Sequence, residues 1–192
     1  MSDALVPYRL ARRVGDALDR CGVPWVVGGS LASSVHGMPR STHDVDLVAR
    51  LAPTQRAALH DELVAMGYVD PDAMGAAIAQ GRAFNFIDDA TCEKVDVFCV
   101  DARRAGQIER ARQIEVAPDL SLPILSPEDT VSQKLRWYDL GGRTSQRQWR
   151  DVLEVLRVQG ASIDGTLLRS LAQQLEVTDL LDLAVAEVSR SR

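Results

Sequence analysis

Two aspartates separated by one residue are the side chains in this sequence that most directly indicate chemistry. Asp44 and Asp46 flank Val45 at the start of an apolar segment, and the alternation predicts a strand over 45–48. Residues i and i+2 of a strand project from the same face, with a rise of about 3.3 Å per residue. Two carboxylates placed in this way can hold one or two Mg²⁺ (or Mn²⁺) ions, which take oxygen ligands and bridge to phosphates.

A glycine turn precedes these acids. The apolar run 23–27 predicts a buried strand, and a short helix is expected over 31–35. Between them, Gly28 and Gly29 allow a tight turn and a close approach of the backbone to a ligand. The first N–H groups of the helix, with Ser30 as a cap or a direct ligand, would then face a triphosphate. Taken alone, a glycine pair after a strand is more often only a turn.

A third acid, Asp96, lies within a predicted strand over 94–100. The residues before it predict another strand over 83–87, and the turn between the two strands indicates an antiparallel hairpin. A charge inside an apolar strand is costly if it is buried without a partner. Asp96 is therefore either a solvent-facing strand residue or a carboxylate placed beside Asp44 and Asp46.

Two motifs give the sequence a resemblance to a known family. Val27-Gly28-Gly29-Ser30, followed after thirteen residues by Asp44-Val45-Asp46-Leu47, resembles the signature of the nucleotidyltransferase superfamily, which has the DNA polymerase β-like fold. The segment 37–44 is similar, more narrowly, to the bacterial branch that includes the abortive-infection AbiEii toxins.

The resemblance implies a fold and a reaction. The fold is α/β (α+β), a mixed-sheet nucleotidyltransferase core with a C-terminal helical subdomain closing one side of a cleft. The reaction is metal-dependent transfer of a nucleoside monophosphate from an NTP, such as ATP, to a hydroxyl of RNA, protein or a small molecule. In this family pattern Asp96 completes the metal site with Asp44 and Asp46, or assists deprotonation of the attacking hydroxyl. A toxin role would add an antitoxin protein as a partner.

The second half of the sequence is expected to be helical, over 127–140, 145–158 and one or two helices within 164–189. Lys134 lies on the first of these helices, and Asp151 lies on the second with Arg147 and Arg150. Each of these residues, taken singly, is most simply part of a solvated, salt-bridged helix face. The resemblance to AbiEii-like families implies instead that Lys134 contacts nucleotide phosphates and that Asp151 is catalytic, near the reacting hydroxyl or the metals.

Aromatic residues of the same two helices, Trp137, Tyr138 and Trp149, would either stack on a base or, more commonly at helical spacing, pack in the core.

The loop before the acids holds further candidate ligands. Arg40 could grip a triphosphate through two parallel hydrogen bonds, and Thr42 is a second candidate for nucleotide binding. His36 and His43 allow a zinc site as an alternative. Their spacing does not resemble a closed zinc site, and oxygen ligands favour magnesium.

Composition limits the class of protein. The 192 residues are 46% hydrophobic, enough for a substantial core, and the net charge of −5 argues against a broad nucleic-acid-binding face. Three cysteines without metal-ligand spacing fit a reducing cytoplasm. We expect no signal peptide, because the N-terminus lacks the pattern, and no membrane partner, because no apolar run approaches about 18 residues.

A change in composition near residues 120–126 predicts two domains, a nucleotidyltransferase core at 1–125 and a helical subdomain at 126–192. The core should also contain helices over 7–20, 53–67, 71–81 and 103–111 and a strand over 112–116. Two other functions remain open from the sequence. One is a non-catalytic protein of the same fold that binds a nucleotide or a partner, and the other is an antibiotic-modifying nucleotidyltransferase.

Overall fold

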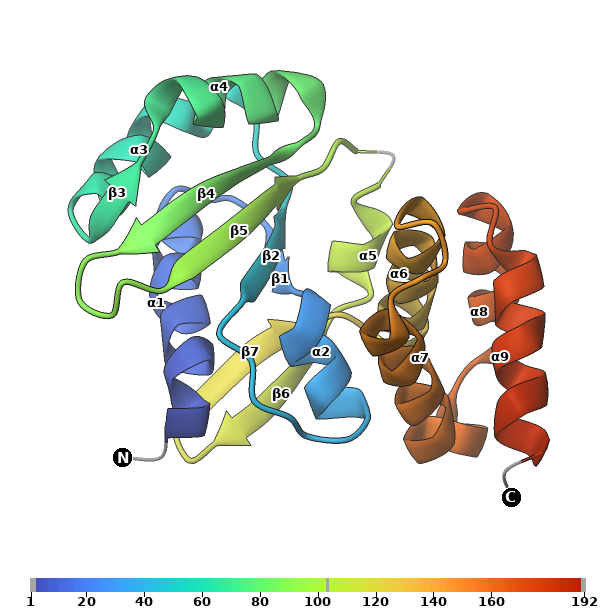
Figure 1. Cartoon of the computed structure of the whole chain (residues 1–192). Helices are drawn as coiled ribbons and strands as arrows, with labels where there is room; N and C mark the ends of the chain where they lie inside the picture. The colour runs from blue at the N-terminus through green and yellow to red at the C-terminus, as the bar shows by residue number, and fades with distance from the viewer. Residues whose placement is uncertain (1–2, 103, 191–192) are drawn as a thin grey trace. The chain divides into compact units, whose positions relative to one another are not determined.

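A seven-stranded mixed sheet positions the acidic residues (Figure 1). The computed structural model describes residues 3–102 and 104–190. The strands are β1 (Trp25–Val27), β2 (Val45–Ala49), β3 (Gly67–Val69), β4 (Ala83–Asp88), β5 (Lys94–Cys99), β6 (Arg112–Ala117) and β7 (Leu120–Ile124). Their order in the sheet is β3-β4-β5-β2-β1-β7-β6. β2 pairs with β5 in parallel and β1 with β7 in parallel, while the other neighbouring pairs are antiparallel.

The described residues fall into two compact units. The first comprises the residues up to Leu31 together with Ser41–Leu125, and the second comprises Ala32–Arg40 together with the residues from Ser126 on. The second unit therefore takes in a segment of nine residues from the first half of the chain. Whether 1–125 and 126–192 fold as separate domains stays a prediction.

The helices lie close to the expected ranges. They are η1 (Asp3–Leu5), α1 (Val6–Arg20), α2 (Gly29–His36), η2 (Pro53–Gln55), α3 (Arg56–Val64), α4 (Pro71–Gln80), α5 (Gly106–Glu109), α6 (Pro127–Leu140), α7 (Gln146–Gln159), η3 (Gly160–Ser162), α8 (Gly165–Gln174) and α9 (Thr178–Arg190). The helix predicted over 103–111 is only the short α5, and residue 103 lies outside the described residues. Two strands were not predicted, β3 and β7.

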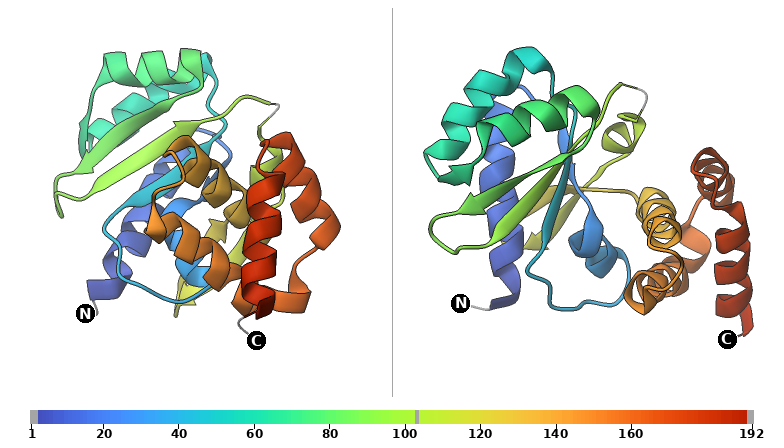
Figure 2. Two further views of the ribbon diagram at one scale, coloured as in Figure 1. Left: turned by 45° about the vertical axis from the view of Figure 1, so that its right-hand side comes forward. Right: turned by 45° about the horizontal axis from the view of Figure 1, so that its top comes forward.

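In the first unit, α1 packs against β1, β2 and β7, while α3 and α4 lie side by side over β3 and β4 (Figure 2). Leu10, Val14 and Leu18 form the buried face of α1, as their four-residue spacing predicts. On β2 and β5 the burial alternates: Val45, Leu47, Val95 and Val97 are buried, and the residues between them are partly exposed. The acids of both strands therefore project from the face opposite these apolar side chains.

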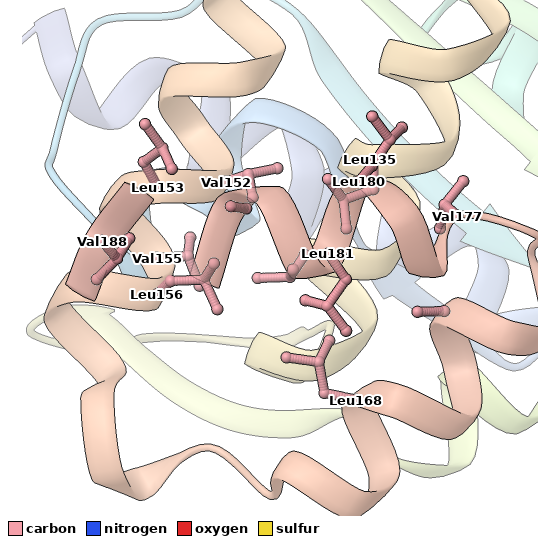
Figure 3. Close-up of a cluster of buried hydrophobic side chains, with 13 residues drawn as sticks. Leu135, Val152, Leu153, Val155, Leu156, Leu168, Val177, Leu180, Leu181 and Val188 are labelled. Carbon is pink, nitrogen blue, oxygen red and sulfur yellow. The ribbon is translucent and has the colours of Figure 1, made fainter. Parts of the chain in front are cut away.

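The second unit has its own apolar core, formed by α6, α7, α8 and α9 (Figure 3). Leu135 of α6, Val152 and Leu156 of α7 and Leu181 of α9 are among its buried members. Side-chain caps fix where these helices begin. Ser126 accepts a hydrogen bond from the amide of Asp129 at 3.1 Å, Pro127 occupies the first helical position, and Ser145 caps α7 in the same way.

Candidate active site

The glycine turn brings the backbone directly against one of the acids. Gly28 N–H donates to the carbonyl of Asp46 at 2.9 Å, so that the turn is tied to β2. Gly29 has a φ of +55°, and a Cβ placed on it would lie 1.7 Å from Oδ2 of Asp46. A side chain at position 29 is therefore excluded both by the left-handed backbone and by the carboxylate. Gly29 is also the first residue of α2, so the Asp46 carboxylate lies at the start of that helix.

The parallel pairing of β2 and β5 sets Asp46 directly opposite Asp96. Asp44 immediately precedes β2 and is exposed, whereas Asp46 and Asp96 are partly buried. The structure thus places all three predicted acids on or next to two neighbouring strands. This arrangement depends on the strand order, because β2 and β5 are separated in sequence by β3 and β4.

Two residues outside the predicted set bind the Asp96 carboxylate. Lys94, two residues earlier on β5, places its Nζ 2.9 Å from Oδ2, and the Nδ2 of Asn85 on β4 donates to Oδ1. Asn85 is the register partner of Asp96 in the β4–β5 hairpin. The hydrogen bond to Asp96, opposed by partial desolvation and reinforced by the charges of Asp96, Asp44 and Asp46, raises the pKa of Lys94 above its usual value. Lys94 is therefore a cation bound to Asp96 that also feels the charges of Asp44 and Asp46.

The donors of this site suit a divalent cation in their chemistry. Carboxylate oxygens are the ligands that Mg²⁺ and Mn²⁺ prefer, and Asp44 and Asp46 supply them on one side of β2. Among the described residues, however, no three His, Cys, Asp or Glu side chains converge closely enough to hold a metal ion. The Asp96 carboxylate is bound by Lys94 and Asn85. In the part of the chain that the structure describes, no cluster of three such side chains is present for a zinc site either.

The other candidate ligands of the first unit lie around the same strands. Ser30, the second residue of α2, is buried. Thr42 is also buried, and its hydroxyl accepts a hydrogen bond from the amide of Asp44 at 3.3 Å. His43 is exposed and contacts Glu93 at 3.0 Å. Thr42 therefore shapes the loop that leads into Asp44, and a role in nucleotide binding stays a prediction.

In the second unit, the carboxylate of Asp151 binds two residues that were predicted to contact the nucleotide, Lys134 and Arg40. Oδ2 of Asp151 lies 2.8 Å from Lys134 Nζ and 2.9 Å from Arg40 Nη2, and Oδ1 accepts from Arg40 Nε at 3.1 Å. The hydroxyl of Ser33 adds a bond of 3.2 Å to Oδ2. The side chains of Lys134 and Asp151 are 7% and 8% exposed, and that of Arg40 is 27% exposed. Asp151 thus accepts from two cations and one hydroxyl.

The electrostatics of Asp151 follow from these contacts. Burial alone would raise its pKa, but the hydrogen bonds from Arg40 and Lys134, with the charges of both cations, outweigh it and lower the pKa. A carboxylate that accepts from three side chains is fixed in orientation and remains ionised. Arg147 and Arg150, which precede it on α7, are exposed.

The aromatic residues divide between the core and the surface. Tyr138 and Trp149 pack against each other, with ring centroids 5.2 Å apart, and against the apolar core of the second unit. The indole N–H of Trp149 donates to Glu187 at 3.0 Å. Trp137 is 49% exposed. The packing of Tyr138 and Trp149 favours the core alternative for these two residues.

Sequence reasoning missed Lys94, Asn85 and Ser33. Lys94 could have been found, because a residue two positions before Asp96 shares its strand face. Asn85 required the register of the hairpin, and Ser33 required the contact of α2 with α7 over 118 residues of sequence. Only the first of these signals is local.

Several solved structures are similar to this chain. The antibiotic-resistance factor ANT(2'')-Ia matches with a TM-score of 0.60 and 14% identity, over 98% of this chain and 100% of its own. A nucleotidyltransferase described as putative, from Thermotoga maritima, matches with a TM-score of 0.51 and 19% identity, over 74% of this chain and 91% of its own. The lincosamide antibiotic adenylyltransferase LnuA matches with a TM-score of 0.52 and 10% identity, over 77% and 94%.

The chain has the nucleotidyltransferase fold. This agrees with the nucleotidyltransferase fold that the resemblance implied and with the expected mixed-sheet α/β class. The narrower AbiEii-type branch is not among these similar structures and stays a prediction. No protein-family model and no curated protein matches the sequence. Across the helices of the described residues, none combines the length and the apolar character that crossing a membrane requires.

Proposed function

We propose that this protein is a metal-dependent nucleotidyltransferase that moves a nucleoside monophosphate from an NTP to a hydroxyl acceptor. One arrangement of residues carries the proposal. Asp46 of β2 lies opposite Asp96 of β5, Asp44 lies two residues before Asp46, and the glycine turn lies against the Asp46 side chain. The nucleotidyltransferase fold supports it. A non-catalytic binding protein of the same fold is disfavoured, because it has no need of three acids on adjacent strands.

The roles of the residues follow from their chemistry. Asp44 and Asp46 would hold Mg²⁺ or Mn²⁺, and Asp96 would complete the metal site by turning its carboxylate from Lys94 to the ion. A bound ion would supply neutralisation of the phosphate charge that develops during transfer. The backbone N–H groups at Gly28, Gly29 and Ser30 would bind the terminal phosphates, because helix N-termini attract anions and glycine leaves the backbone accessible.

The cluster of the second unit suits phosphate as well. Lys134 and Arg40 are the two cations that Asp151 binds, and charged N–H donors of this kind are the groups that phosphate oxygens accept from. We propose that these two residues contact nucleotide phosphates, with Thr42 in a supporting role. Asp151, which the sequence suggested as catalytic, is better suited to positioning both cations, because its oxygens already accept from three side chains.

The test is transfer of label from an α-³²P NTP in the presence of Mg²⁺. Asp44→Asn with Asp46→Asn should abolish metal-dependent transfer, a loss of at least about a hundredfold. Asp119→Asn is a matched control: it also removes one carboxylate of the first unit, and its exposed turn position has a φ of +62°, which asparagine tolerates. Labelling by the double variant equal to that of the wild type would sink the proposal.

The acceptor can be sorted by its class. ANT(2'')-Ia has been solved with adenylyl-2''-tobramycin, and LnuA is an antibiotic adenylyltransferase, so a small-molecule hydroxyl is the first class to test. The net charge of −5 also suits a cationic small molecule better than RNA. Parallel reactions with aminoglycosides, total RNA and cell protein would separate the classes. Transfer to RNA or protein, with growth arrest on expression relieved by a neighbouring gene product, would instead establish a toxin with an antitoxin partner.

A further inference from the structure

Lysine is rare in this sequence, and each lysine binds one of the acids that the sequence singles out, one in each unit. The sequence has 22 lysine and arginine residues in total, and only Lys94 and Lys134 are lysines. Lys94 is bonded to Asp96 and Lys134 to Asp151. Arginine and lysine differ in what they can do: guanidinium is a rigid planar fork, whereas the ammonium is a compact charge on a flexible stem.

The Lys94 ammonium neutralises Asp96 from a position that leaves its side chain room to move. Its side chain is 49% exposed, so it can turn away from Asp96 without disturbing the apolar face of the sheet. Asp96 is only 20% exposed, and its second oxygen stays with Asn85. The ammonium also interacts with the charges of Asp44 and Asp46. It therefore lies where three carboxylates attract a cation, and its ion pair is with Asp96, which the strand register sets opposite Asp46.

We propose that Lys94 is the resident counter-ion of the three acids, that it competes with the divalent cation for Asp96, and that binding of the cation releases it. The inference rests on the proposed function, because it concerns the metal site of that reaction. Its consequence is that the metal-free protein keeps its clustered carboxylates neutralised in part. After release, the ammonium adds a positive charge beside the site, as a triphosphate requires.

The first test measures metal binding without nucleotide, by the electron paramagnetic resonance signal of free Mn²⁺. Lys94→Met should bind Mn²⁺ more tightly than the wild type, by about three- to tenfold, since the competing ion pair is partly exposed. Arg9→Met, which removes an exposed cation of α1, is the matched control and should leave the affinity unchanged. Unchanged or weaker binding by Lys94→Met overturns the inference.

A double-mutant cycle separates competition for Asp96 from a general loss of positive charge. In the Asp96→Asn background, the effect of Lys94→Met on Mn²⁺ affinity should largely disappear, because the contested carboxylate is gone. An effect of the same size in both backgrounds would show long-range charge alone and would also overturn the inference.

The scarcity of lysine permits a direct observation of the release. Reductive ¹³C-methylation labels only Lys94, Lys134 and the N-terminal amine, and the Lys94 signal is assigned by its loss in Lys94→Met. On titration with Mg²⁺, this signal should shift with the same midpoint as metal binding measured by calorimetry. Metal binding by the wild type with a stationary Lys94 signal refutes the inference and leaves the proposed function standing. Absence of metal binding in the wild type and in all variants refutes the proposed function, and the inference with it.

Discussion

The two acid–lysine pairs of this protein differ in how firmly they are held. Asp96 is bound by Lys94 and Asn85 on a partly exposed strand face, whereas Asp151 is nearly buried and accepts from Lys134, Arg40 and Ser33. A buried charge with several partners is costly to disturb, and an exposed pair contributes little. The two ion pairs are therefore suited to different roles. The Lys94–Asp96 pair can exchange partners, whereas Asp151 holds Lys134 and Arg40 in fixed positions.

The largest expected effect is the loss of stability on removing the charge of Asp151. Asp151→Asn removes the charge that buried Lys134 and partly buried Arg40 both bind, and should lower the free energy of unfolding by about 3–5 kcal/mol. Asp96→Asn, the matched change at the exposed pair, should cost about 1 kcal/mol or less. Urea unfolding followed by circular dichroism measures both. Equal losses would remove the distinction between the two pairs.

The contribution of Asp151 to the free energy of unfolding depends on pH, and the direction of that dependence follows from its pKa. The pKa of Asp151 is lower in the folded protein than in the unfolded chain, so its contribution is complete above the unfolded value of about 4 and is lost as the pH falls through the folded value. The stability difference between wild type and Asp151→Asn should therefore be constant from pH 7 to about pH 5 and shrink in stronger acid. A difference that grows on acidification contradicts the assignment.

An effect of intermediate size is expected at Gly29, whose backbone lies against the Asp46 carboxylate. Gly29→Ala forces a side chain into the left-handed region and against the Asp46 carboxylate, and should cost about 1–3 kcal/mol as well as weaken Mn²⁺ binding. Gly28→Ala is the control, since its Cβ would be tight only against the movable end of Leu125 at 3.2 Å and would otherwise make ordinary contacts at 3.8 Å or more. Thermal unfolding and Mn²⁺ titration of both variants decide the point. Equal behaviour of the two would show that the contact of Asp46 with Gly29 does not matter.

The smallest expected effect refines the description of the Asp151 cluster. Ser33→Ala removes one hydrogen bond of 3.2 Å to Asp151 while leaving both cations, and should lower the free energy of unfolding by about 1 kcal/mol. Ser34→Ala, the next residue of α2, is the comparison: its hydroxyl makes a longer contact of 3.5 Å with the carbonyl of Arg40. A loss at Ser33 as large as that of Asp151→Asn would mean that the hydroxyl, and not the charge pair, holds the cluster together.

The sequence by itself determined the local features. Alternation of apolar and acidic residues placed Asp46 and Asp96 on strand faces away from the core, and Ser126 with Pro127 marked the start of α6. Such patterns are readable because side-chain direction in a strand and capping at a helix end depend on residues a few positions apart. β3 and β7 were missed for local reasons: the helix expected over 53–67 extends to Gly67, where β3 begins, and Pro123 argues against an interior strand.

Only the tertiary structure decided which residues meet. The position of β5 beside β2, and with it Asp96 opposite Asp46, depends on the whole strand order. The bonds of Asp151 to Arg40 join residues 111 positions apart, and those of Asp96 to Asn85 depend on the register of the hairpin. No local periodicity encodes these distances, because they result from the packing of complete elements around two cores. The sequence therefore determined the acids and their faces, and the fold decided which cation each acid holds.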